Sequence, residues 1–176
     1  MHAILTELSQ PIPAAGLICF TVLLVYAAVS DLLTMRIPNW LNGAIAYTWI
    51  AYALLLPLDY TEMGLRVVWA LGVFSVAAWM FFRGWMGGGD VKMIPAVMLW
   101  IPSIHYYELL AVVSMYGGAL ALGVLMLRAF AMPVFTVGWV WLERIHSMQK
   151  KIPYGIAIAC GGLTIKYMEI TGNLLT

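Results

Sequence analysis

Apolar segments close to membrane-crossing length recur along the whole chain, and they constrain its fold more than any other feature. A helix needs about 20 predominantly apolar residues to cross a hydrocarbon core. Of the 176 residues, 64% are hydrophobic and 10% are charged, whereas about 25% of the residues in a soluble domain are charged. So few polar residues cannot cover a soluble surface. We therefore predict an all-α, polytopic membrane protein.

Proline, glycine and charged residues divide the apolar sequence into six candidate membrane spans. We predict helices over residues 13–33, 39–56, 63–82, 91–101, 106–128 and 153–170. The fourth is short for a hydrocarbon core about 30 Å thick, and residues 133–141 form a candidate re-entrant or interfacial segment. The first dozen residues carry no lysine or arginine before the apolar run, so we expect no cleaved secretory signal.

The charged residues predict which helix ends share a side of the membrane. If the first helix runs from outside to inside, seven basic residues lie at cytoplasmic ends and two, Arg66 and Lys166, lie toward the other side. This bias follows the positive-inside rule. The acids on the cytoplasmic side are then Asp31, Asp90 and Glu143. The charge pattern therefore predicts that Asp31 and Asp90 share the cytoplasmic face.

Several classes of function find no support in the sequence. The net charge is +1 and no basic block suggests a nucleic-acid partner. Cys19 and Cys160 lie in apolar segments without ligand spacing, so we expect them to be small core residues. His2, His105 and His146 are scattered over opposite predicted faces, without an HExxH motif. The pattern therefore predicts no metal site and no other cofactor.

Asp31 lies near the end of the first apolar run, where an ionisable side chain is costly to insert. Leu32 and Leu33 continue the hydrophobic stretch beyond it. Aspartates in such positions usually face a protein interior or a watery cavity, which makes Asp31 a candidate functional residue. The alternative is a helix-end aspartate that reaches the headgroups or pairs with Arg36.

Asp90 follows three consecutive glycines, Gly87, Gly88 and Gly89, just before the fourth apolar run. Glycine permits backbone angles and close approaches that other residues forbid, and three in a row predict a mobile loop. The structural alternative to a functional role is that Asp90 caps the start of the next helix. Capping is compatible with a chemical role, because a cap needs only one carboxylate oxygen.

Two carboxylates on one membrane face suggest hydrolytic chemistry. Carboxylates that cleave a peptide bond act as a pair, in which one accepts a proton from the attacking water and the other donates a proton to the carbonyl oxygen. Close together they share a proton, because both cannot ionise cheaply. A site at the membrane edge combines partial desolvation with access to cytoplasmic water.

Three motifs resemble those of the type IV prepilin peptidases, a family of GxGD membrane aspartic proteases. They are DLLTMRIPN from Asp31, GGGDVK from Gly87, and KIPYGIAIACGG from Lys151. The resemblance covers most of the chain and is closest to the short, single-domain members that serve Flp-type (tight-adherence) pili. It implies that Asp31 and Asp90 are the catalytic pair and that no cofactor is needed. The implied substrate is a Flp-like prepilin, cleaved after the glycine that ends its basic leader.

The resemblance carries further expectations about the whole chain. Residues 1–176 are expected to form a single membrane-embedded peptidase domain, without a soluble domain, in the bacterial inner membrane. The large bifunctional members add a cysteine-rich cytoplasmic domain and N-methylate the new terminus, so we expect peptidase activity alone here. Gly87 and Gly89 match the two motif glycines. The pilus assembly machinery is a further expected partner.

Other residues near the motifs have expected supporting roles. Lys92 is expected to meet lipid phosphate, or else to bias the ionisation of the second aspartate. Pro38 and Asn39 are expected to fix the chain structurally where it re-enters the membrane. Gly155 and Ala159 share one face of the last helix, which favours close helix packing and leaves contact with a substrate helix as the alternative.

Two alternatives remain open at this stage. A preflagellin-type GxGD peptidase would use the same chemistry on another precursor. In a non-catalytic membrane subunit or small transporter, Asp31 and Asp90 would pair with Arg36 and Lys92 or carry protons, although no inverted repeat supports transport. Glu143 is expected to form a solvated pair with the adjacent arginine, or to meet the basic leader.

Overall fold

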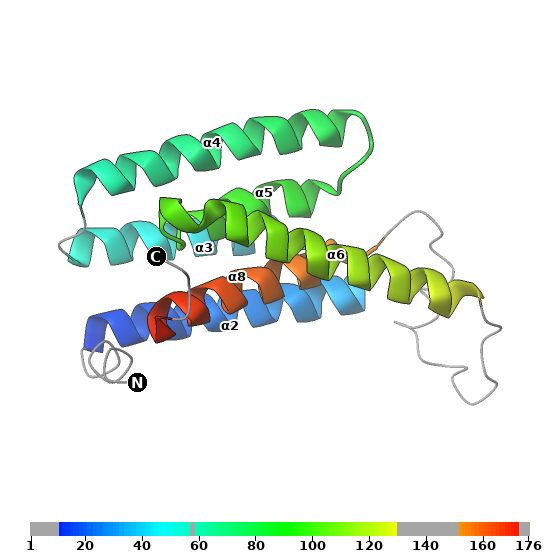
Figure 1. The fold of residues 1–176 in the computed structure, drawn as a ribbon, viewed down its shortest axis with the longest axis horizontal. Helices are drawn as coiled ribbons and strands as arrows, with labels where there is room; N and C mark the ends of the chain where they lie inside the picture. The colour runs from blue at the N-terminus through cyan, green and yellow to red at the C-terminus, as the bar shows by residue number, and fades with distance from the viewer. Residues whose placement is uncertain (1–10, 57–58, 130–151, 173–176) are drawn as a thin grey trace.

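The computed structural model describes residues 11–56, 59–129 and 152–172. Within these ranges the chain is all-α, with six α-helices and one short 3₁₀ helix (Figure 1). They are α2 (Pro11–Thr34), α3 (Asn39–Leu55), α4 (Tyr60–Phe82), α5 (Gly88–Met98), η1 (Ser103–His105), α6 (Tyr106–Ala129) and α8 (Tyr154–Thr171). The predicted all-α fold and its six helical segments are confirmed. The candidate interfacial segment 133–141 and Glu143 lie outside the described residues.

Three of these helices are long and apolar enough to cross a membrane by length and composition. They are Pro13–Thr34 within α2, Tyr60–Phe82, and Ser103–Ala129, which combines η1 and α6. The other three, α3, α5 and α8, have 17, 11 and 18 residues. A helix satisfies its own backbone hydrogen bonds, which is why lipid favours this class of structure. The chain is therefore a polytopic membrane protein whose helices differ in length.

The outer surface of the helices is largely apolar. In α4 only the small residues Ala70 and Ala77 are buried, while Phe82 is 84% exposed. An exposed apolar surface of this extent indicates a lipid environment. The prediction that Cys19 and Cys160 are core residues is wrong, because both are exposed. Lipid accommodates a small apolar side chain as well as a protein core does, so hydropathy alone does not separate the two locations.

The short helix α5 is central to the bundle. It contacts α3, α4 and α8, while α2 packs against α3 and α8, and α6 packs against α8 (Figure 1). Seven of its eleven residues are buried. Successive helices run in opposite directions, so the end of α2 and the starts of α3, α5 and α8 lie at one end of the bundle (Figure 1). We call this the aspartate end, because Asp31 and Asp90 lie there.

Trp100, which follows α5, joins three elements in the core. It is 1% exposed, and its ring stacks on that of Phe20 with centroids 4.7 Å apart. The ring of Tyr52 lies 5.2 Å away. The indole N–H donates to the carbonyl oxygen of Ile45 at 2.9 Å, which removes the cost of burying an unpaired donor. Trp100 thereby connects α2 and α3 to the end of α5.

A polar cluster attaches α4 at the opposite end of the bundle. The carboxylate of Glu62 accepts hydrogen bonds from the backbone N and the Oγ of Ser103, both at 2.7 Å. The same carboxylate pairs with Nε of Arg66 at 3.0 Å. Arg66 also donates from Nη1 to the carbonyl oxygen of Leu99 at 3.3 Å. These bonds fix the start of α4 to the connection between α5 and α6.

Small residues let α8 approach its neighbours closely. A Cβ atom built on Gly161 would lie 2.4 Å from Cγ2 of Val113 in α6. Gly155 and Ala159 are also buried in α8. Small residues at helix interfaces allow backbones to come together in lipid. The packing role predicted for Gly155 and Ala159 is therefore confirmed.

We predict that Gly161→Leu destabilises the protein by about 1–3 kcal/mol, the usual cost of overpacking. The new side chain would overlap Val113 and part of the α6 backbone. The midpoint of thermal unfolding in detergent measures the effect. Gly118→Leu is the matched control, because a Cβ atom there meets no heavy atom within 4 Å. Equal midpoints for the two variants would contradict the close packing of α6 on α8.

Candidate active site

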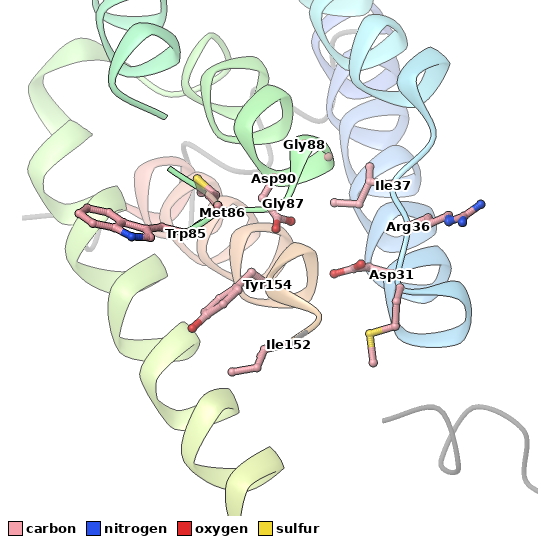
Figure 2. Close-up of a pocket in the computed structure, with 13 residues that line it drawn as sticks. Asp31, Arg36, Ile37, Trp85, Met86, Gly87, Gly88, Asp90, Ile152 and Tyr154 are labelled. Carbon is pink, nitrogen blue, oxygen red and sulfur yellow. The ribbon is translucent and has the colours of Figure 1, made fainter. Parts of the chain in front are cut away.

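Asp31 lies in the last turn of α2 and is 5% exposed. Its Oδ2 accepts a hydrogen bond from the backbone N of Gly155, in the first turn of α8, at 2.8 Å. In Figure 2 the Asp31 side chain points into the pocket, whereas Arg36 points away from it. The alternative in which Asp31 pairs with Arg36 is therefore wrong. A free N–H group at a helix start, which suits a carboxylate, is its partner.

The chain reverses sharply after α2. Met35 has φ 53°, and this left-handed conformation ends the helix. The hydroxyls of Ser30 and Thr34 donate to the carbonyl oxygen of Arg36 at 2.9 and 3.1 Å. Pro38 then occupies the N-cap position of α3, so its predicted structural role at this helix start is confirmed. Local bonds thus hold the short connection that forms one wall of the pocket.

Asp90 lies in the first turn of α5 and is 8% exposed. The N-cap of this helix is Gly87, so the alternative in which Asp90 is the capping residue is wrong. The predicted loop is also wrong for Gly88 and Gly89, which are helical; their packing outweighs the low helix propensity of glycine. A Cβ atom on Gly87 would lie 2.8 Å from Oδ2 of Asp90. Glycine at the N-cap therefore leaves room for the carboxylate.

One pocket of about 500 Å³ is lined by both aspartates. Its other walls are the connection after α2, residues 84–89, and Ile152 and Tyr154 at the start of α8. Figure 2 shows Asp31 and Asp90 pointing toward the same space, from α2 and from α5. The structure therefore brings together the two carboxylates that the charge pattern put on one side, although they are far apart in the sequence.

Ile37 packs between the first turns of α5 and α8. A Cβ atom on Gly89 would lie 2.9 Å from Cβ of Ile37, and one on Gly155 would lie 2.6 Å from its Cδ1. The Gly155 Cβ would also lie 2.8 Å from Oδ2 of Asp31. The sequence predicted a packing role for Gly155, with substrate-helix contact as the alternative, and did not predict its bond to Asp31. The feature that could have indicated its bond to Asp31 is its position in the first turn of a helix, where N–H groups are free.

Two hydrogen bonds between α3 and α5 hold the start of α5. Nζ of Lys92 donates to Oδ1 of Asn39 at 2.8 Å, a protein partner that the sequence did not predict. Nδ2 of Asn42 donates to the carbonyl oxygen of Gly89 at 3.2 Å. Asn42 is 5% exposed and was not predicted. The sequence feature that could have identified Asn42 is an amide in an apolar helix, three residues beyond Asn39 and so on the same face.

Two buried carboxylates beside one cavity can bind and orient a water molecule. A carboxylate accepts hydrogen bonds, and its protonated form also donates one. Such a pair titrates as a unit, because the two charges interact. The described residues contain no group of three or more His, Cys, Asp or Glu that could hold a metal ion. His105 lies in η1, away from this pocket, and His2 and His146 lie outside the described residues.

Comparison with known families matches residues 18–135 to the type IV leader peptidase family. The matched region contains both aspartates and the three glycines, and it ends before α8. Comparisons with curated proteins and with solved structures found no match. The family match nevertheless covers more than half of the chain and includes the first two sequence motifs, DLLTMRIPN and GGGDVK. The chain belongs to the type IV leader peptidase family and is an aspartic prepilin peptidase.

Proposed function

We propose that Asp31 and Asp90 are the catalytic pair with which this peptidase removes the basic leader of a Flp-like prepilin. The observation that carries the proposal is the single pocket lined by both side chains. Both aspartates are buried, and they are the only acidic residues among those that line this pocket in the described chain. Family membership supplies the reaction, which is prepilin leader cleavage.

The reaction requires one ionised and one protonated carboxyl group. The ionised carboxylate takes a proton from a water molecule as the water oxygen attacks the scissile carbonyl carbon. The protonated carboxyl group donates its proton to the carbonyl oxygen. When the tetrahedral intermediate collapses, the carbon–nitrogen bond breaks and the leaving nitrogen takes up a proton from the pair. The products are the leader and the mature pilin, and no cofactor takes part.

The neighbouring backbone supports this role for Asp31. Gly155 N–H holds Oδ2 of Asp31, so the other oxygen is left to face water or substrate. Ile37 packs against the first turns of both α5 and α8, which limits the relative movement of the two aspartates. Catalytic groups act efficiently when neighbouring atoms fix their orientation before substrate binds.

We also propose that the protein lies in the inner membrane of a bacterium and that its aspartate end faces the cytoplasm. The positive-inside bias supports this orientation, with seven basic residues at that side of the predicted topology. The apolar helix of the precursor would lie in the bilayer beside the enzyme, with its basic leader in the cytoplasm. The resemblance to short, single-domain members supports a single peptidase domain without N-methylation, acting with the pilus assembly machinery.

Either aspartate variant, Asp31→Asn or Asp90→Asn, is expected to lower leader removal by at least about 100-fold, because each removes one proton-transfer group. The measurement is a gel-shift assay of a co-expressed Flp-like prepilin, with membrane insertion of the enzyme checked in parallel. Asp59→Asn is the matched control, since Asp59 caps α4 at the other end of the bundle and asparagine also caps helices well. Near-normal cleavage by either active-site variant would refute the pair. A preflagellin assayed in the same way tests the alternative precursor.

Gly155→Ala is expected to reduce leader removal at least about tenfold while the enzyme still inserts. The added methyl group would lie too close to both Ile37 and the Asp31 carboxylate, and small displacements of catalytic groups are costly. Gly118→Ala controls for the general effect of alanine in these helices, because its Cβ meets open space. Equal rates for the two variants would exclude a role for Gly155 in holding Asp31.

A further inference from the structure

A second cavity of the described chain lies on the other side of α5 from the aspartates. It has a volume of about 490 Å³, its walls are α3 and α4, and its floor is α5. It shares no lining residue with the catalytic pocket. Four of its lining residues are small, namely Gly43, Ala46, Ala70 and Ala96. Such residues leave space for the backbone of another helix to approach closely. We call this cavity the α3–α4 groove.

The groove contains two buried polar groups that lack partners. Asn42 and Trp49 both line it and are 5% and 4% exposed. Within the described chain, Oδ1 of Asn42 and Nε1 of Trp49 have no hydrogen-bond partner. They are seven residues apart on α3, so they lie on one face about 10 Å apart along the axis. Unpaired buried polar groups are costly, and a hydrocarbon chain cannot satisfy them. A peptide can.

The groove begins beside the catalytic pocket. Asn39 and Lys92 lie at this mouth, and Trp49 and Leu99 line its deeper part. Asn42 connects the two cavities directly, because its Nδ2 donates to the carbonyl oxygen of Gly89, the residue before Asp90. The lined part of α3, residues 39–50, spans about 16 Å, which is about half of a hydrocarbon core.

We propose that the α3–α4 groove binds the transmembrane helix of the prepilin substrate, an inference that rests on the proposed function. The start of the substrate helix lies near Asn42, whose Oδ1 is unpaired but covered by neighbouring atoms. A small side-chain movement on substrate binding would bring it to the unpaired N–H groups that every helix start presents. A hydrogen-bond acceptor on the substrate helix, about two turns deeper, meets the indole N–H of Trp49. The extended segment before that helix then crosses the first turn of α5 and delivers the leader junction to Asp31 and Asp90.

Site-specific photo-cross-linking tests where the substrate helix lies. A photoactivatable phenylalanine analogue replaces Ile50, which lines the groove, or Tyr47, which does not. Both positions are exposed on α3, at 47% and 71%, so they differ mainly in the direction they face. The enzyme carries Asp90→Asn to keep the precursor intact. The probe is a Flp-like prepilin that the wild-type enzyme has been shown to cleave, so a failure of the proposed function is recognised beforehand.

We expect a cross-link to the precursor from position 50 and little or none from position 47. Equal cross-linking from both positions would overturn the proposal. The proposal would also be overturned if the analogue at position 50 cross-linked to phospholipid, or to a second copy of the enzyme, while the precursor is present.

Filling the groove provides an independent test. Gly43→Leu adds a side chain to the groove, and its Cβ meets no heavy atom within 4 Å. Gly72→Leu is the matched control on α4, where the Cβ also meets nothing and the residue does not line the groove. We expect kcat/KM for the precursor to fall about tenfold or more in Gly43→Leu, equivalent to about 1.4 kcal/mol, and to stay within about twofold of wild type in Gly72→Leu. Wild-type kcat/KM in Gly43→Leu would contradict the proposal.

Discussion

The hydrogen bond from Gly155 N to Oδ2 of Asp31 is the interaction on which the arrangement of the site depends. An aspartate in the last turn of an apolar helix is costly unless a donor meets it. The start of α8 supplies that donor, because the first N–H groups of a helix have no partner within it. For the bond to form, α8 must approach α2 so closely that a methyl group at position 155 would collide with Asp31 and Ile37.

The same constraint determines how α5 is held. Ile37 fills the space between Gly89 and Gly155, so the connection after α2 packs on the first turns of both α5 and α8. From the opposite side, Asn39 and Asn42 bond to Lys92 and to the Gly89 carbonyl. The short helix that carries Asp90 is therefore held from two sides. One side faces the catalytic pocket, and the other forms the floor of the α3–α4 groove.

The lengths of the apolar segments predicted the helices, and the distribution of charge predicted that the two aspartates share one end. Both are properties that can be read along the chain. Hydrogen bonds between helices could not be predicted from the sequence. Lys92 is an example, because its partner Asn39 is remote in the chain. The first turn of α5 was predicted as a loop, because packing against Ile37 overrides the low helix propensity of glycine there. Cys19 was placed in the core because hydropathy does not distinguish lipid from protein interior.

The central claim is that Asp31 and Asp90 act on one substrate carbonyl as a pair. A peptide that spans the leader junction, with a secondary hydroxyl group in place of the scissile amide, tests this claim most directly. It mimics the tetrahedral intermediate, so its hydroxyl should contact both carboxyl groups at once. The account predicts tight binding to the wild-type enzyme and at least about 100-fold weaker binding to Asp31→Asn and to Asp90→Asn. Unchanged affinity in either variant would contradict it.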